Sequence, residues 1–339
     1  MTSTIRISES VAILETANKT HLVVYTSTRK TREFNFDNLI LDILEKTRDD
    51  KIVDTLVEEL SKKYEKNNIE KAITTLEHFG ILRLRAEHIN KRYKRQLQFI
   101  DELTPSWIET VEKQKKLEDA TVTIFGVGGI GTWIVNGLHQ IGIGKLRIVE
   151  PDKVEESNLN RQLYFSSDDI GLYKVDVLKK KLTDSKIEIH KMKITEESDL
   201  ENLIKDSTFL VNCADQPSVS ETTRIIDKHA QKQKIPYCVS GGYNLHLGMV
   251  GPIIVPGKTA TFDDFLEYQK AQDPLRDFKK IKDVEQSGNL GPIAGAISNI
   301  QVMEIFKHLT GLGKPNYNKF AEINFMDFSV EWRYFGSSL

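Results

Sequence analysis

The chain is poor in cysteine, because only Cys213 and Cys238 occur among its 339 residues. Two cysteines cannot build a disulfide framework or a four-cysteine zinc site. We therefore expect a cytoplasmic protein without structural zinc. Both cysteines lie in apolar, strand-like stretches, FLVNCA and PYCVS, which predicts buried thiols without a catalytic role.

An excess of one charge is also missing. The 47 basic and 49 acidic residues leave a net charge of -2, which gives no general attraction to nucleic acid or to an anionic membrane. No apolar run approaches the length of a membrane-spanning helix. The first residues, MTSTIRISESVAILET, lack the charged-then-apolar order of a signal peptide. We expect neither nucleic acid nor a membrane as a partner.

The residue pattern changes along the chain, which predicts more than one domain. Residues 1–90 read as three strands, IRISESVAILET, HLVVYTST and TREFNF, followed by three helices, a small α+β module of the winged-helix sort. Residues 91–117 predict a charged helical connector. In residues 118–339 strands alternate with helices, which predicts an α/β fold with a Rossmann-like, mostly parallel sheet. Residues 262–290 form a long charged segment that either closes over a substrate or is a surface excursion.

A glycine-rich turn, IFGVGGIG, lies between a predicted strand and a predicted helix. Its glycines have no side chains to keep a phosphate away from the backbone N–H groups and the helix N-terminus; they are Gly126, Gly128, Gly129 and Gly131. Glu150 closes the next strand, where an acid can accept hydrogen bonds from ribose hydroxyls. These features alone fit NAD as well as ATP.

The residues that follow favour ATP. A polar cluster comes directly after the ribose-binding strand: Asn158, Asn160, Arg161 and Gln162. A hydride-transfer enzyme has no evident use for it, whereas a guanidinium can grip the oxygens of a triphosphate. Further along, Lys174 is a point-charge phosphate binder, and Asp215 ends a strand where a carboxylate can hold Mg²⁺ together with the triphosphate.

The order of GVGGIG, VEPDKVEESNLNRQ, IGLYKVDVLKKKL and VNCAD resembles that in the ubiquitin-activating-type adenylating enzymes, represented by ThiF, MoeB and HesA, over roughly residues 88–311. This resemblance implies adenylation of a carboxylate by MgATP with release of pyrophosphate. It implies a nucleotide-binding set that adds to the glycines Glu150, Asp152, Asn158, Arg161, Gln162 and Lys174. It implies Asp215 as the Mg²⁺ ligand and a catalytic set of Arg95, Arg161, Lys174 and Asp215.

Two further matches concern partners. The motif RYKRQ matches one that precedes the family's nucleotide domain, which implies a homodimer in which Arg95 reaches into the ATP site of the other subunit. Family members that activate sulfur carriers commonly have a CxxC pair where this chain has Thr261 and Asp264. That departure implies that no zinc is bound.

Residues 1–90 resemble the peptide-recognition domains of enzymes that modify ribosomally made peptides, nearest to the MccB-like branch. Such modules add a peptide strand to an exposed sheet edge. We therefore expect an ATP-dependent adenylyltransferase that activates a carboxylate of a ribosomal peptide, as in peptide-antibiotic biosynthesis. Two alternatives stay open. One is activation of a ubiquitin-like sulfur-carrier protein, and the other is a catalytically idle peptide-binding subunit of another modifying enzyme.

Overall fold

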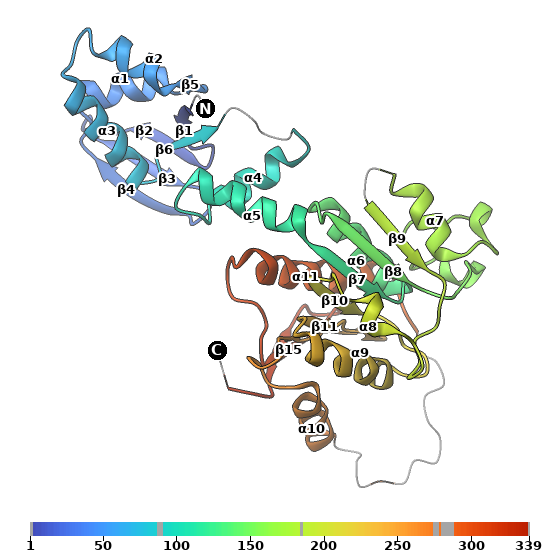
Figure 1. Ribbon diagram of the computed structural model, residues 1–339. Helices are drawn as coiled ribbons and strands as arrows, with labels where there is room; N and C mark the ends of the chain where they lie inside the picture. Colours follow the sequence, from blue (N-terminus) through green and yellow to red (C-terminus); the bar gives the residue numbers. More distant parts are fainter. Residues whose placement is uncertain (1–2, 87–90, 184–185, 274–277, 279–287, 338–339) are drawn as a thin grey trace. The chain divides into compact units, whose positions relative to one another are not determined.

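The computed structural model describes residues 3–86, 91–183, 186–273, 278 and 288–337. The chain divides into two compact units, Met1–Lys115 and Lys116–Leu339 (Figure 1). The boundary falls within helix α5 (Trp107–Asp119). Each unit has its own buried apolar cluster.

The first unit combines two small antiparallel sheets with helices. One sheet has the order β2–β3–β4, from Val11–Glu15, His21–Tyr25 and Lys30–Phe34. The other has the order β5–β1–β6, from Lys51–Ile52, Ser3–Ile7 and Leu82–Ala86. The helices are α1 (Asn38–Lys46), α2 (Val53–Leu60) and α3 (Lys66–His78). Their apolar residues at helical spacing meet Ile5 and Val23 of the strands in one core.

The structure corrects one detail of the strands expected here. IRISESVAILET is not one strand, because a turn in which Val11 N–H donates to the Ser8 carbonyl (3.1 Å) separates β1 from β2. The two pieces belong to different sheets. The unit continues into helix α4 (Lys94–Asp101), which buries Leu97 and Ile100.

The second unit is built on a six-stranded sheet with the order β14–β11–β10–β7–β8–β9. Five of its strands pair in parallel: β7 (Thr121–Phe125), β8 (Lys145–Val149), β9 (Lys186–His190), β10 (Phe209–Asn212) and β11 (Tyr237–Val239). The edge strand β14 (Ile253–Ile254) is antiparallel. Chain connections from β7 and β10 leave in opposite directions, which is the switch point of a doubly wound sheet.

Helices cover both faces of this sheet (Figure 1). On one face α8 (Leu200–Leu203), α9 (Val219–Gln233) and α10 (Phe262–Gln272) share a buried apolar cluster with the strands. On the other face α6 (Gly129–Gln140) packs against α11 (Gly291–Thr310), with α7 (Lys174–Lys181) beside β9. The missing side chains of Gly137 and Gly295 leave room for Val302 and Trp133 at the α6–α11 contact.

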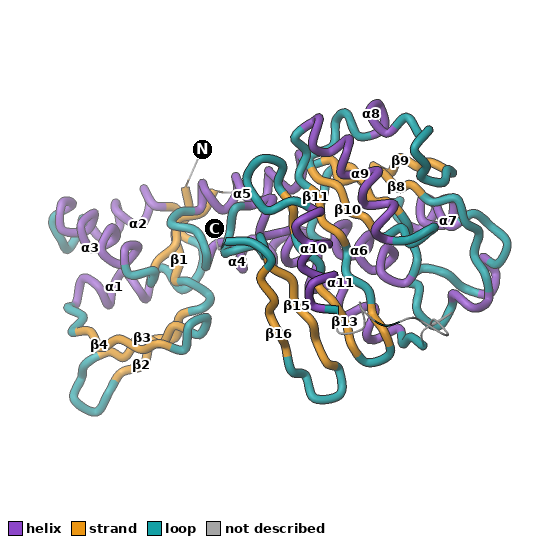
Figure 2. The backbone as a smooth tube through the Cα atoms, turned by 90° about the horizontal axis from the view of Figure 1, so that it is seen from below, coloured by secondary structure: helices purple, strands orange, loops and turns teal. Residues whose placement is uncertain are grey.

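A four-stranded antiparallel sheet, not expected from the alternating pattern, completes the unit. Its order is β12–β13–β15–β16, from Tyr243–Asn244, Leu247–Val250, Lys319–Asn324 and Val330–Tyr334. Figure 2 shows β15 and β16 as a long hairpin. Helix α11 packs on this sheet, and Val250, Ile293, Ile297, Ala321 and Ile323 form the buried cluster between them.

The segment 262–290 begins as a helix and not as a loop, because α10 occupies Phe262–Gln272 and buries Phe262 and Phe265 in the core. Residues 274–277 and 279–287 of this segment lie outside the described residues. The two alternatives predicted for the segment, closure over a substrate and a surface excursion, therefore stay predictions. Among the described residues, no helix has both the length and the apolar character that a membrane crossing requires.

Candidate nucleotide-binding site

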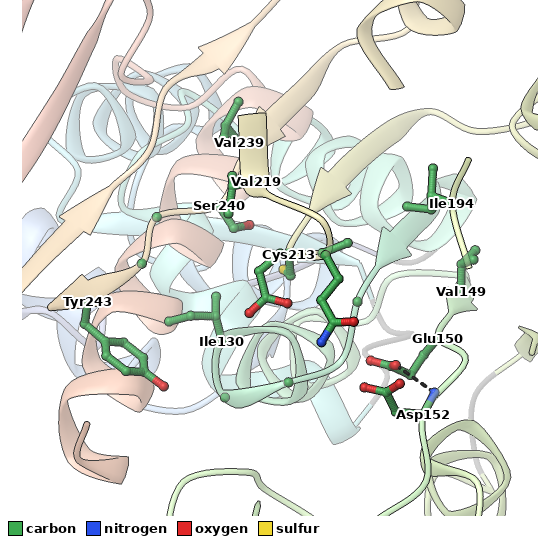
Figure 3. A pocket seen from close by; sticks show the side chains of 18 of the residues that line it. Ile130, Val149, Glu150, Asp152, Ile194, Cys213, Val219, Val239, Ser240 and Tyr243 are labelled. Carbon is green, nitrogen blue, oxygen red and sulfur yellow. Dashed lines mark hydrogen bonds between the residues drawn. The ribbon is translucent and has the colours of Figure 1, made fainter. Parts of the chain in front are cut away.

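A cavity of about 770 Å³ opens at the carboxyl ends of the parallel strands. Figure 3 shows Glu150 and Asp152 at one end of it and Ser240 and Tyr243 at the other, with Cys213 between them. The cavity lies at the switch point between β7 and β10, which is where a doubly wound sheet leaves a crevice for a ligand.

Two of the glycines shape the floor of the cavity. Gly126 has a φ of +85°, and a Cβ there would lie 2.7 Å from the backbone N of Ala214, so only glycine fits. Gly128 differs, because nothing lies within 4 Å of a Cβ built on it. It is also the N-cap of α6, and no side chain caps that helix. The first N–H groups of α6 are therefore open to an anion in the cavity.

The other two glycines have packing roles. A Cβ on Gly129 would lie 2.5 Å from the Tyr243 hydroxyl, so this glycine lets Tyr243 approach the turn. A Cβ on Gly131 would collide with the carbonyl oxygen of Gly126. Gly131 does not line the cavity, in contrast to the contact with nucleotide that the motif predicts. It brings the start of α6 close to the strand end.

Glu150 directly follows β8 and is buried. Its Oε2 accepts a hydrogen bond from Val127 N–H (2.7 Å), and its Oε1 accepts one from Asp152 N–H (3.0 Å). Lys174 is also buried, with Nζ 3.3 Å from Asp152 Oδ2 and 4.0 Å from Glu150 Oε2. Burial raises the pKa of Glu150, while the Lys174 charge opposes that rise. A carboxylate and an ammonium are thus held side by side at this wall of the cavity.

The NLNRQ cluster forms the next wall. Asn158 is buried, and its Oδ1 accepts a hydrogen bond from Glu155 N–H (3.1 Å), so it shapes the turn that carries the cluster. Gln162 lines the cavity, and its buried Oε1 has no hydrogen-bond partner among the described residues. A buried amide oxygen without a partner costs free energy, which a donor from a ligand would recover.

Arg161 also lines the cavity. Its Nη1 donates to the carbonyl of Ser157 and to Asn160 Oδ1 (3.1 Å), and its own carbonyl accepts from Trp133 Nε1 (3.0 Å). Tyr243 lies against it. Burial raises the pKa of the Tyr243 hydroxyl, and the Arg161 charge opposes that rise. The guanidinium is therefore anchored at its base and keeps donors for a ligand.

Asp215 and Cys213 follow β10. Asp215 is exposed and lines the cavity. No group of three or more His, Cys, Asp or Glu side chains suited to a metal ion occurs among the described residues. The donor chemistry nevertheless fits Mg²⁺, which takes one or two carboxylates and completes its shell with phosphate oxygens and water.

The two cysteines differ in exposure. Cys238 is buried, as expected, but Cys213 is only partly buried and lines the cavity. Burial raises the pKa of the Cys213 thiol to about 12. It also raises the pKa of the Cys238 thiol. A raised pKa disfavours the thiolate, so neither thiol is a ready nucleophile.

Three of the residues singled out in the sequence are not among those that line the cavity. Arg95 is exposed on α4 of the first unit and does not line it. Thr261 and Asp264 form a capping box at the start of α10, in which the Thr261 hydroxyl accepts from Asp264 N–H (3.2 Å) and Asp264 Oδ2 accepts from Thr261 N–H (2.7 Å). The pair that stands in place of a CxxC motif thus stabilises a helix end.

Some lining residues carry no motif and were missed. They are Met192, Lys193 and Ile194 after β9, Ser240, Gly241 and Gly242 after β11, and Tyr243 of β12. The predicted strand ends were the signal available, because the carboxyl ends of parallel strands share one edge of the sheet.

The fold and the cavity define a doubly wound α/β protein with a nucleotide-type site at its switch point. Its family follows from comparison of sequences. The profile of the ThiF family matches residues 93–337, so the chain belongs to the ThiF family. The resemblance to the ThiF/MoeB-type enzymes is therefore confirmed.

Curated relatives are similar over part of the chain. The Escherichia coli sulfur carrier protein ThiS adenylyltransferase is 26% identical over 250 residues, which cover 71% of this chain and 89% of that protein. The E. coli molybdopterin-synthase adenylyltransferase is 30% identical over 212 residues, 61% of this chain and 79% of that protein. The chain spans about half the length of other relatives, namely 50% of the Scheffersomyces stipitis adenylyltransferase and sulfurtransferase UBA4 and 56% of the Bacillus subtilis ThiS adenylyltransferase.

Solved structures are similar over nearly the whole chain. E. coli MccB, in a structure with ATP, has a TM-score of 0.71 at 21% identity, covering 99% of this chain and 98% of that one. PaaA has a TM-score of 0.72 at 24% identity, covering 97% of this chain and 100% of that one. Identity this low shows the fold alone, and it confirms the expected α/β class with a parallel Rossmann-type sheet.

Proposed function

We propose that this protein is an ATP-dependent adenylyltransferase that activates a carboxylate. The observation that carries the proposal is the uncapped N-terminus of α6, which opens into the same cavity as Lys174 and Asp215. Such a helix end binds phosphate, and the two side chains supply the charges that a magnesium triphosphate needs. Curated relatives in the same family are named adenylyltransferases.

The reaction requires a substrate carboxylate oxygen to bond to the α-phosphorus of ATP while the bond from that phosphorus to the β-phosphate bridging oxygen breaks. Pyrophosphate leaves with the electron pair, and the acyl-adenylate remains. The protein's part is to hold the two reactants in line and to stabilise charge on the leaving group. Lys174 and Arg161 supply fixed positive charge, and Glu150 holds the ribose. Asp215 would hold Mg²⁺, which supplies further charge neutralisation when it is bound.

Binding is tested first by titration calorimetry of the full chain with MgATP and, separately, with NAD. We expect a clear MgATP isotherm and none with NAD, because a triphosphate uses Lys174 and Arg161 where a dinucleotide does not. Binding of NAD in the absence of ATP binding would refute the proposal.

Turnover is tested by exchange of labelled pyrophosphate into ATP. Asp215→Asn should lower exchange about 100-fold or more with the fold unchanged, because a metal-holding carboxylate acts mainly on the transition state. The control is Asp263→Asn, because Asp263 is a largely exposed carboxylate in the first turn of α10 and does not line the cavity. Equal activity of both variants would remove Asp215 from the mechanism.

The substrate class we propose is a short ribosomally made peptide, bound in part by residues 1–90. The support is the full-length similarity in fold to MccB, which has been solved with the peptide MccA. Thr261 and Asp264 cap a helix where sulfur-carrier enzymes of the family commonly have cysteines. The raised pKa of the Cys213 and Cys238 thiols argues against an enzyme-bound thioester.

A sulfur-carrier protein is the second candidate, because relatives at 26–30% identity are named for it. Pyrophosphate exchange separates the two. A short peptide of the MccA type is one carboxylate substrate to be tested, and a ThiS-type carrier is the other. Exchange driven by the peptide supports the proposal, and exchange driven by the carrier supports the second candidate. ATP binding with no exchange for either would leave the idle binding subunit as the better description.

We also propose a homodimer in which Arg95 completes the site of the other subunit. Arg95→Ala and Asp215→Ala should each be inactive alone. Mixing the two should restore part of the activity, because one site of a mixed dimer lacks neither group. Absence of recovery after verified subunit exchange would place Arg95 outside the partner's site.

A further inference from the structure

Tyr243 lines the cavity, and none of the proposed ATP contacts uses it. Figure 3 shows it at the end of the cavity opposite Glu150, the proposed ribose acid. A Cβ built on Gly129 would lie 2.5 Å from the Tyr243 hydroxyl and 3.5 Å from Cγ and Cδ of Arg161. The hydroxyl and the Arg161 side chain therefore meet at the first turn of α6.

The antiparallel sheet fixes the position of this hydroxyl. Strand β12 pairs with β13, and the Tyr243 ring packs against the apolar cluster between that sheet and α11. The preceding residue is held as well, because Met249 N–H donates to the Gly242 carbonyl (2.8 Å). Burial raises the pKa of the hydroxyl, and the charges of Arg161 and Asp215 act on it in opposite senses. The hydroxyl therefore faces the part of the cavity to which we assign the phosphates and Mg²⁺.

The glycines before Tyr243 leave open space in the same wall. Gly241 and Gly242 both line the cavity. A Cβ on Gly241 would lie 1.4 Å from the Met249 carbonyl oxygen, so the fold requires glycine there, whereas nothing lies within 4 Å of a Cβ on Gly242. Gly242 also lacks a positive φ. The fold thus allows a side chain at position 242, and its absence leaves room for a ligand next to Tyr243.

A neutral hydroxyl suits the carboxylate that is to be activated. The attacking oxygen gives up negative charge as its bond to the α-phosphorus forms, so a cation bound to the carboxylate would stabilise the ground state more than the transition state. A tyrosine hydroxyl donates a hydrogen bond and adds no charge. In the proposed site, phosphate already has donors in the α6 N-terminus, Lys174 and Arg161.

We propose that Tyr243 binds the acyl substrate in the proposed adenylation, on which this inference rests. Its hydroxyl donates a hydrogen bond to the carboxylate oxygen that does not attack, and the chain end that bears the carboxylate lies over Gly242. The other oxygen bonds to the α-phosphorus while pyrophosphate leaves with the electron pair. Tyr243 keeps its proton throughout, and the acyl carbonyl oxygen of the adenylate remains its acceptor.

Two stable nucleotide analogues separate the acyl contact from nucleotide binding. One is 5′-O-sulfamoyladenosine, and the other carries an acetylglycyl group on the sulfamate nitrogen, which imitates an acyl-adenylate with a minimal chain end. Calorimetry of the full chain with each analogue gives the gain in affinity that the acyl group supplies. Tyr243→Phe should reduce that gain about tenfold, because one hydrogen bond to the ligand is lost, and should leave the affinity for the unacylated analogue unchanged.

Tyr317→Phe is the matched control. Tyr317 is half-buried like Tyr243, and burial raises the pKa of its hydroxyl too. The hydroxyl lies 2.8 Å from His308 Nδ1, and Tyr317 does not line the cavity. This variant should bind both analogues as the wild type does. Gly242→Leu is a second probe, because a side chain in the open space should lower the gain by about tenfold or more through steric exclusion of the acyl group.

The two analogues also separate failure of this inference from failure of the proposed function. If the unacylated analogue binds and the gain is unchanged in both Tyr243→Phe and Gly242→Leu, the inference is wrong and the nucleotide site stands. The same holds if the acyl group gives the wild type no gain. Binding of neither analogue would refute the proposed function itself, and this inference with it.

Discussion

Two helices begin at the same cavity, and their first turns are opposites. The N-cap of α6 is Gly128, with no side-chain hydrogen bond, whereas Thr261 and Asp264 close the first turn of α10 in a capping box. Both helices place residues in the cavity wall. An uncapped helix start leaves orphan N–H groups that cost stability unless something else binds them. The difference supports the proposal that the α6 terminus binds phosphate, whereas the α10 terminus serves the fold.

The largest loss of stability should come from replacing Gly126, which the turn before α6 requires. Gly126→Ala should lower the free energy of unfolding by about 3 kcal/mol or more, because the added Cβ meets the backbone of Ala214 and the residue has a positive φ. Gly128→Ala is the matched control, since open space surrounds its Cβ. Urea denaturation measures both. A stable Gly126→Ala variant would show that the turn adapts.

A side-chain cap added to α6 would remove the difference between the uncapped start of α6 and the capped start of α10. Gly128→Asp should lower ATP affinity about 100-fold or more, because the carboxylate would take the N–H groups and repel phosphate. The same change should leave the free energy of unfolding unchanged or raise it by up to about 1 kcal/mol. Calorimetry and denaturation report the two quantities separately. Unchanged ATP affinity would contradict a phosphate site at this terminus.

The two acids beside these turns should titrate differently. Burial raises the pKa of Glu150. Hydrogen bonds from the Thr261 hydroxyl and backbone N–H lower that of Asp264. As the pH falls, Glu150 takes up its proton at a higher pH than an exposed glutamate does, and in the proposed ribose site its hold on ribose hydroxyls should weaken. Asp264 stabilises the fold above its unfolded pKa, near 3.8, and this contribution is lost only as the pH falls through its lower folded value.

ATP affinity should therefore drop on acidification while α10 remains capped. Calorimetry from pH 8 to about pH 5 measures the drop. Glu150→Gln is the control, because residue 150 cannot titrate in this variant. Any pH dependence that remains in it comes from other groups, including ATP itself. Parallel pH profiles of the two proteins would remove Glu150 from the ribose site.

The smallest effect should be at α10. Thr261→Ala removes the hydroxyl that accepts from Asp264 N–H, so the free energy of unfolding should fall by about 1 kcal/mol. ATP affinity should stay within about twofold, because the capping bonds do not face the cavity. A large loss of ATP affinity would mean that the start of α10 positions the ligand, which would contradict a purely structural role for its capping box.

The parallel sheet was predictable because its signals are local. Each strand is a short apolar run, and the helices that the alternation predicts are observed as α6, α7 and α9. The glycine turn, Glu150 and Asp215 were found for the same reason, because each sits at a strand end that the alternation reveals.

The antiparallel sheet was not predictable in the same way. Its strand β12 has only two residues, and β13 pairs with β15, which lies about seventy residues further on. Pairing between such distant segments leaves no local periodicity to read. The separation of β1 from β2 was missed because a turn at Ser8 interrupts an otherwise continuous strand pattern. The lack of a hydrogen-bond partner for Gln162 Oε1 among the described residues depends on its neighbours in space, and no sequence motif predicts those neighbours.

Because the two units have separate cores, a ligand of one unit should affect the thermal unfolding of that unit most. A ligand that binds only the folded form of one unit stabilises that unit by about 2.7 kcal/mol at one hundred times its dissociation constant. In the proposed function, ATP would stabilise the unit built around Phe125 and Leu210, whereas a ligand of the first unit would stabilise the core around Ile5 and Val23. In a thermal melt, each ligand should therefore raise mainly the transition temperature of the unit that binds it.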